Sequence, residues 1–176
     1  MEEQPVWYVM RFLYNRRSGT RERLNKAAIE TFVPMRYEIK IRNGKKILTY
    51  DPVIRYLLFV HSTKKVLAPF LEADNYFQYQ YRRGGRQAEP LVVPDNQMER
   101  FIHAVKMSEQ PIYFTPQELN ISKGTRIRIH GGPFDGTEGV FMKVKGARAK
   151  RLVVELPNTL AVAVEVNPEL IEVLPG

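Results

Sequence analysis

Residues 130–136 have the sequence HGGPFDG, and this short stretch decides the fold of the C-terminal third of the chain. Its three glycines permit the positive φ angles that a sharp chain reversal requires. Pro133 fixes φ at the start of the turn, and Phe134 is a large apolar side chain that can close one end of a small barrel. Gly139 comes directly before a strand-like run, a position typical of a bulge or of a close backbone approach. The pattern predicts a tight reversal between two strands.

Short alternating runs of apolar residues follow and precede this turn, separated by Gly, Pro, Asn and Lys or Arg. They cover residues 126–129, 140–144, 152–156 and 160–166. Short strands at this spacing are typical of a small closed barrel. The last two runs are rich in valine, which favours strands, so we predict a β-barrel here rather than a helical hairpin.

The N-terminal part alternates between strand-like and helix-like segments. Short apolar runs predict strands at 6–12, 32–42, 45–50, 53–61 and 76–82. Helical spacing and capping residues predict helices from Ser18 to about Glu30, over 64–72, and from Pro94 through Val105. Asn43-Gly44 is a hairpin turn, and the nearly all-apolar run 53–61 belongs at the centre of its sheet. We therefore predict an α+β chain, with an antiparallel N-terminal sheet and helices on one face, followed by the barrel.

The chain is predicted to form two domains, over 1–107 and 122–176, joined by a proline-stiffened linker over 108–121. Its net charge is +8. Residues 1–110 carry 19 Lys and Arg against 12 Asp and Glu, whereas residues 111–176 carry 8 against 7. A basic excess that belongs to one part of a chain favours a polyanion or an acidic protein surface as the partner of that part.

Several functional classes are disfavoured by what the sequence lacks. There is no cysteine, which excludes disulfides, thiolate metal sites and a cysteine nucleophile. No apolar run approaches the roughly 20 residues of a membrane helix, and no signal-peptide pattern follows the acidic first residues, so we expect a cytoplasmic protein without a membrane partner. Three scattered histidines, His61, His103 and His130, show no metal-ligand spacing, and no phosphate loop or nucleophile elbow is present. We expect a protein that is not an enzyme and holds no metal or cofactor.

The string 123–140, which contains the glycine-rich turn, resembles the KOW motif of NusG-type transcription elongation factors and of some ribosomal proteins. The motif positions are Gly132, Pro133, Phe134, Gly136 and Gly139. The motif alone leaves both families open, and the N-terminal part decides between them. The segments that occur there in the order and spacing of the NusG N-terminal (NGN) domain are Trp7-Tyr8-Val9, Phe32-Val33-Pro34-Met35, the basic hairpin 42–46 and Leu58-Phe59-Val60. The resemblance covers about residues 6–174 and is nearest to the specialised RfaH-like and UpxY-like antiterminators.

The resemblance implies a transcription elongation or antitermination factor with an NGN domain over 1–107 and a KOW, SH3-like barrel over 122–176. In that family the N-terminal sheet docks on the clamp helices of the largest RNA polymerase subunit and suppresses pausing or termination. The KOW domain recruits a further partner, such as the ribosome or a termination factor. For this chain the resemblance implies a monomer that acts on specific long operons, such as those for polysaccharide biosynthesis.

Two sets of N-terminal residues are candidate binding sites. Leu57 stands where the family has an aromatic lining the polymerase-binding pocket, and it shares a strand face with Phe59, so we predict that both contact RNA polymerase. A basic cluster around the first helix is predicted to bind the non-template DNA strand by neutralising phosphates. Its members are Arg11, Arg16, Arg17, Arg21, Arg23 and Lys26. The alternative is a KOW-type RNA-binding or ribosome-associated protein, which would carry its basic excess in the C-terminal part instead.

Overall fold

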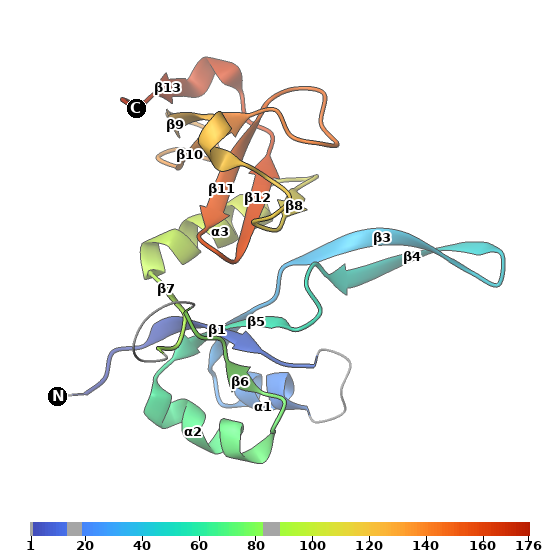
Figure 1. The fold of residues 1–176 in the computed structure, drawn as a ribbon, viewed down its shortest axis with the longest axis vertical. Coiled ribbons are helices and arrows are strands. Elements are labelled where there is room, and N and C mark those ends of the chain that lie inside the picture. Colours follow the sequence, from blue (N-terminus) through green and yellow to red (C-terminus); the bar gives the residue numbers. More distant parts are fainter. Residues whose placement is uncertain (1, 14–18, 83–88) are drawn as a thin grey trace. The chain divides into compact units, whose positions relative to one another are not determined.

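The computed structural model describes residues 2–13, 19–82 and 89–176 (Figure 1). Its contacts divide the chain into two compact units, Met1–Asp95 and Asn96–Gly176. Both contain helices and antiparallel sheets, which confirms the predicted α+β class. The division falls earlier than the predicted domain end at residue 107, because the helix α3 (Asp95–Met107) belongs with the second unit. No helix in the described ranges is both long enough and apolar enough to cross a bilayer.

The first unit is built on an antiparallel sheet with the strand order β2-β5-β1-β6, and β7 also pairs with β1. The strands are β1 (Val6–Arg11), β2 (Glu30–Phe32), β5 (Leu57–Ser62), β6 (Gln78–Tyr79) and β7 (Val92–Val93). Tyr8 lies opposite Val60 and Met10 opposite Leu58, so these four side chains share one face. They form the buried core with residues of α1 (Thr20–Lys26) and α2 (Lys64–Ala73).

The helix α1 is shorter than predicted. Its predicted cap, Ser18, lies outside the described residues, and the helix ends at Lys26 instead of continuing to Glu30. Ala28 adopts a φ of 59°, and the Ile29 N–H donates to the Leu24 carbonyl at 3.0 Å. This left-handed ending closes the helix and lets Glu30 begin strand β2. At the other end, the buried Thr20 hydroxyl donates to Asp74 at 2.6 Å, which ties α1 to the end of α2.

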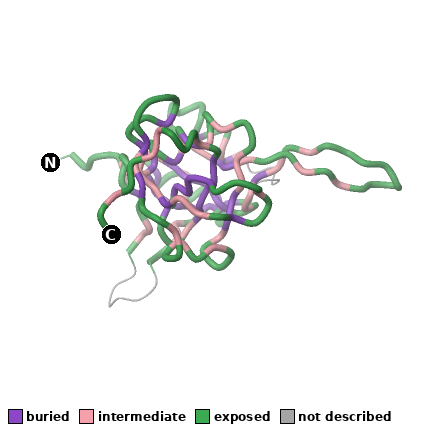
Figure 2. The backbone as a smooth tube through the Cα atoms, turned by 90° about the horizontal axis from the view of Figure 1, so that it is seen from above, coloured by how far each residue is buried: buried purple, intermediate pink, exposed green. Residues whose placement is uncertain are grey.

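A long hairpin, β3 (Met35–Arg42) and β4 (Lys45–Pro52), forms a two-stranded sheet of its own. It extends away from the five-stranded sheet of its unit, and most of its backbone is exposed (Figures 1 and 2). The predicted Asn43-Gly44 turn is confirmed, since both residues have positive φ, 51° and 75°. Strand β4 continues through Pro52, and residues 53–56 turn before β5, so the predicted strand over 53–61 begins too early.

The second unit contains an antiparallel sheet of six strands in the order β13-β9-β10-β11-β12-β8. Its strands are β8 (Ile112–Phe114), β9 (Thr125–Ile129), β10 (Glu138–Met142), β11 (Arg151–Leu156), β12 (Leu160–Val164) and β13 (Ile171–Val173). The valine-rich runs form β11 and β12, so the prediction of strands rather than a helical hairpin is confirmed. Strand β8 lies inside the segment predicted as a linker, because Tyr113 and Phe114 are buried and pair with β12.

The interior of this sheet is apolar, with one charged exception. Val140, Val144, Val153 and Phe114 belong to one buried cluster. Arg151 is only 5% exposed. Its guanidinium donates to the carbonyls of Gln110 at 2.6 Å and Ala163 at 3.2 Å, and to the Glu165 carboxylate at 3.1 Å. A buried charge needs such partners, so Arg151 fixes β11 to β12 and to the segment that leads into β8.

Candidate functional site

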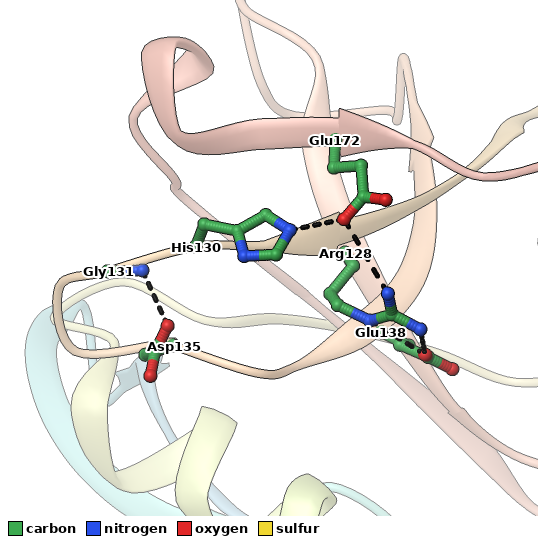
Figure 3. Close-up of polar contacts among 6 residues, drawn as sticks. All are labelled: Arg128, His130, Gly131, Asp135, Glu138 and Glu172. Carbon is green, nitrogen blue, oxygen red and sulfur yellow. Dashed lines mark hydrogen bonds and ion pairs between the residues drawn. The ribbon is translucent and has the colours of Figure 1, made fainter.

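The glycine-rich turn has the backbone that its sequence predicts. Gly131, Gly132 and Gly136 have φ angles of 89°, 71° and 79°. The Asp135 carboxylate accepts a hydrogen bond from the Gly131 N–H at 2.6 Å, which closes the turn on itself (Figure 3). Three residues with positive φ within six positions are strained for side chains other than glycine, so the motif glycines are explained by conformation.

Two further motif residues have structural roles. Phe134 is buried, and its ring meets the His103 ring of α3 edge-on, with centroids 6.2 Å apart. A methyl group on Gly139 would lie 2.4 Å from the Val153 carbonyl oxygen on the neighbouring strand. The predicted close backbone approach at Gly139 is therefore confirmed. These positions build the fold of the second unit, and none of them presents a reactive group.

A polar network lies beside this turn, between β9, β10 and β13 (Figure 3). Arg128 forms an ion pair with Glu138 and lies 3.5 Å from Glu172, and His130 contacts the same Glu172 carboxylate. The His130 contact, followed by the Arg128 charge, holds the pKa of Glu172 below its usual 4.5. Arg128 likewise lowers the pKa of Glu138. The network ties three strands together through charge.

This network predicts a specific acid response. A carboxylate whose folded pKa is depressed stabilises the fold above its unfolded pKa, and the contribution is lost as the pH falls through the folded value. We expect His130→Gln to raise the pKa of Glu172 toward 4.5 and to weaken the acid sensitivity of the second unit below that pH. Carboxyl-carbon NMR titration of Glu172 measures this directly, with His103→Gln as the control. An unchanged titration in His130→Gln would contradict the assignment.

The predicted polymerase contacts, Leu57 and Phe59, lie at the start and middle of β5. Leu57 pairs with Arg11 and Phe59 with Val9 on one side and Phe32 on the other. The two side chains are 2% and 0% exposed. They share the face opposite Leu58 and Val60, as the alternation predicts.

The predicted nucleic-acid residues divide into three groups. Arg16 and Arg17 lie outside the described residues. Arg11 is exposed at the end of β1, and its guanidinium lies 5.3 Å above the ring of Tyr56, itself half exposed. Arginine over an aromatic ring is a favourable cation–π arrangement, and both groups remain accessible to a partner.

The third group consists of the cations of α1. Arg23 and Lys26 are exposed, and Arg21 is half-buried. The Arg23 guanidinium donates to the Thr20 hydroxyl at 3.1 Å, which places it at the buried Thr20–Asp74 hydrogen bond. One short helix therefore presents three cations, of which Lys26 and Arg23 are the more accessible.

The sequence prediction missed the most exposed apolar surface of the first unit, one face of the β3–β4 hairpin. Its cross-strand pairs are Tyr37 with Tyr50, Ile39 with Leu48 and Ile41 with Lys46. The five apolar members of these pairs are between 56% and 72% exposed, and the two tyrosine rings lie 4.7 Å apart. A contiguous exposed apolar patch marks an interaction surface. The sequence feature that could have revealed this face is the alternation of apolar residues on both sides of Asn43-Gly44.

The opposite face of the same hairpin is polar. Lys40 Nζ lies 2.9 Å from Asp51 and Arg36 Nε lies 2.7 Å from Glu38. The Lys40 contact lowers the pKa of Asp51. We call the face with Tyr37, Ile39, Ile41, Leu48 and Tyr50 the hairpin's apolar face. The hairpin is thus amphipathic, with one polar face and one exposed apolar face.

The three histidines have separate surroundings. His61 lies against Trp7, with ring centroids 5.0 Å apart, while His103 and His130 contact Pro133 and Glu172. Within residues 2–13, 19–82 and 89–176, no three His, Asp or Glu side chains gather closely enough to hold a metal ion.

Comparison with known proteins gives one family match. The family model described as transcription termination factor NusG matches residues 5–102, more than half of the chain. Among solved structures, one described as domain interaction in Thermotoga maritima NusG has 15% identity and a TM-score of 0.44, covering 96% of this chain and 97% of that one. A structure of an MjSpt4:Spt5 complex has 15% identity and a TM-score of 0.27, covering 97% of each chain. No curated protein matches.

Proposed function

Because this chain belongs to the NusG family, we propose that it binds RNA polymerase during elongation and suppresses pausing or termination. The family match over 5–102 covers nearly all of the first unit. The observation that carries the proposal is the hairpin's apolar face, which lies inside the matched range. An apolar surface of this extent on a chain with net charge +8 calls for a protein partner that covers it.

The dimensions of this face suit a helix of the polymerase clamp. Two paired strands are about 5 Å apart, so with their side chains they form a ribbon about 10 Å wide. Eight residues per strand give a length of about 26 Å, which matches an α-helix of about 17 residues. The exposed cations at the tip, Arg42, Lys45 and Lys46, favour acidic residues beside the helix. Leu57 and Phe59 are proposed as a second contact.

The basic residues of the first unit are proposed to bind DNA. Arg11, Arg23 and Lys26 are exposed on the same unit and can neutralise phosphates of the non-template strand, together with Arg21 and with Arg16 and Arg17. Phosphate contacts of this kind make binding fall as salt rises. We propose that the second unit recruits a further partner, such as the ribosome or a termination factor, and that the targets are specific long operons.

An elongation assay tests the proposal. Paused complexes of the cognate RNA polymerase are assembled on the leader upstream of the protein's own gene, and pause lifetimes are measured with and without the full chain. We expect shorter pauses and co-elution with polymerase, both weakening as salt rises. Unchanged pause lifetimes together with co-purification with ribosomes alone would contradict the proposal and favour the RNA-binding alternative. Binding to the polymerase complex that does not change with salt concentration would contradict the proposed phosphate contacts of the basic residues.

A further inference from the structure

The loop between β10 and β11 joins two neighbouring strands of the second unit (Figure 1). Met142 pairs with Arg151, so the loop proper covers residues 143–150. Val144 is buried in the core cluster, Ala147 packs against that cluster, and the Ala147 N–H donates to the Val144 carbonyl. Gly146 has a φ of 92°, which turns the chain at this point. The loop is thus held at its middle and at both ends.

This loop carries four cations and no acidic residue. They are Lys143, Lys145, Arg148 and Lys150. All four are exposed, and none takes part in an ion pair within the described ranges. The adjacent Arg151 is different, because it is buried and bonded to Gln110, Ala163 and Glu165. The structure therefore separates four available cations from one that holds the fold together.

The charge of the second unit is concentrated in this loop. Residues 96–176 carry 10 Lys and Arg against 9 Asp and Glu, a net charge of +1. Since residues 143–150 contribute +4, the rest of the unit has a net charge of −3. Some acids outside the loop are already engaged, as Glu138 and Glu172 are by Arg128. The near-neutral total of the unit therefore hides a loop with a net charge of +4.

The composition of the loop identifies the chemistry that it binds. Its other residues are Val144, Gly146, Ala147 and Ala149, and Val144 is buried. The loop therefore offers no aromatic or large apolar anchor for the centre of a protein interface. It also lacks an aromatic platform on which bases could stack. What remains is a set of cations suited to phosphates.

We propose that the 143–150 loop binds the phosphate backbone of a nucleic-acid duplex without reading its sequence. This site is separate from the basic residues of the first unit and needs no RNA polymerase. RNA and DNA duplexes present the same phosphate chemistry, so either is a ligand for this surface. The negative remainder of the unit repels the backbone and so orients the loop toward it.

Fluorescence anisotropy with the full chain tests the proposal, using labelled RNA and DNA duplexes of about 20 base pairs over a range of salt concentrations. The test variant replaces the four loop cations by glutamine: Lys143→Gln, Lys145→Gln, Arg148→Gln and Lys150→Gln. The matched control makes the same charge change at exposed cations of the same unit: Arg100→Gln, Lys106→Gln, Lys123→Gln and Arg126→Gln. Both variants retain every cation of the first unit.

The expected effect follows from counterion release. The logarithm of the binding constant falls with the logarithm of the salt concentration, with a slope of about 0.9 per neutralised phosphate. Each engaged cation therefore contributes roughly eightfold in affinity at about 0.1 M salt. Two engaged cations therefore predict a loss of about 60-fold in the loop variant, with a salt slope shallower by about 2, against less than about fivefold in the control. Comparing the RNA and DNA arms shows which duplex the surface prefers.

Two results would overturn the proposal. One is an equal loss in the loop variant and the control, which would mean that only total charge matters. The other is competition by poly-glutamate as effective as that by a duplex of equal charge, which would make the surface a site for acidic protein. NMR of the unaltered chain adds a check independent of any variant, since duplex must shift the amide signals of 143–150 more than those of Lys123 and Arg126.

Discussion

Gly139→Ala is expected to reduce the free energy of unfolding of the second unit by about 3 kcal/mol. The added methyl group would lie 2.4 Å from the Val153 carbonyl oxygen and 2.7 Å from a Leu152 methyl carbon. The oxygen belongs to the backbone of β11, which pairs with β10 through Val153 and cannot withdraw without breaking that pairing. The strand must therefore separate locally from its neighbour.

Gly136→Ala is the matched control for this experiment. Gly136 has a positive φ of 79°, but a methyl group there would meet no atom within 4 Å. Its cost is limited to the left-handed backbone, about 1 kcal/mol. Chemical denaturation, followed by the signals of the second unit, measures both variants. Equal losses would show that the β10–β11 approach is looser than the structure has it.

Substituting the hairpin's apolar face is expected to weaken polymerase binding by tenfold to hundredfold, about 1.4 to 2.7 kcal/mol. The test variant combines Ile39→Ser with Leu48→Ser, a cross-strand pair at the middle of the face. These side chains are 70% and 66% exposed, so their loss costs the fold little. On binding, each would bury apolar area whose contribution is about 25 cal/mol per Å².

The control alters the opposite face of the same strands. Glu38→Ser with Thr49→Ser changes a cross-strand pair on the polar face and leaves the hairpin's apolar face intact. Affinity for purified RNA polymerase is measured by biolayer interferometry, alongside thermal unfolding of each variant. Full affinity in the apolar-face variant would remove the hairpin from the docking surface. A loss that accompanies unfolding of the first unit would show that the face has a structural role instead.

The features that the sequence predicted correctly are those that local chemistry controls. Asn43-Gly44 and the glycines of 131–136 specify backbone angles by themselves, and the valine-rich runs of β11 and β12 specify strands. Features that depend on distant partners were misplaced. Helix α1 ends before Glu30 because residues 30–32 pair with β5 as β2, and β8 forms inside a proline-containing segment because β12 pairs with it. Neither partner can be read from the neighbouring residues.

The predictions about the candidate sites also succeeded where local pattern decides and failed where the fold decides. Alternation placed Leu57 and Phe59 on one face, but periodicity does not reveal that this face is buried. It likewise gives no sign that the hairpin's apolar face is exposed, since an apolar alternation normally indicates a core. Net charge over 111–176 suggested a near-neutral C-terminal part, because the total hides the four cations of 143–150; the burial of Arg151 is visible only in the fold.

The amphipathic hairpin has a consequence for the protein when it is alone in solution. A two-stranded sheet has two open edges, and an apolar face beside open edges is a template for ordered aggregation. Arg42, Lys45 and Lys46 gather at the tip, and Lys46 stands on the apolar face itself, opposite Ile41. Two hairpins that approached face to face would bring these like charges together. Charge repulsion by Arg42, Lys45 and Lys46 therefore opposes aggregation of the free protein. It leaves the apolar face open to a partner of opposite charge.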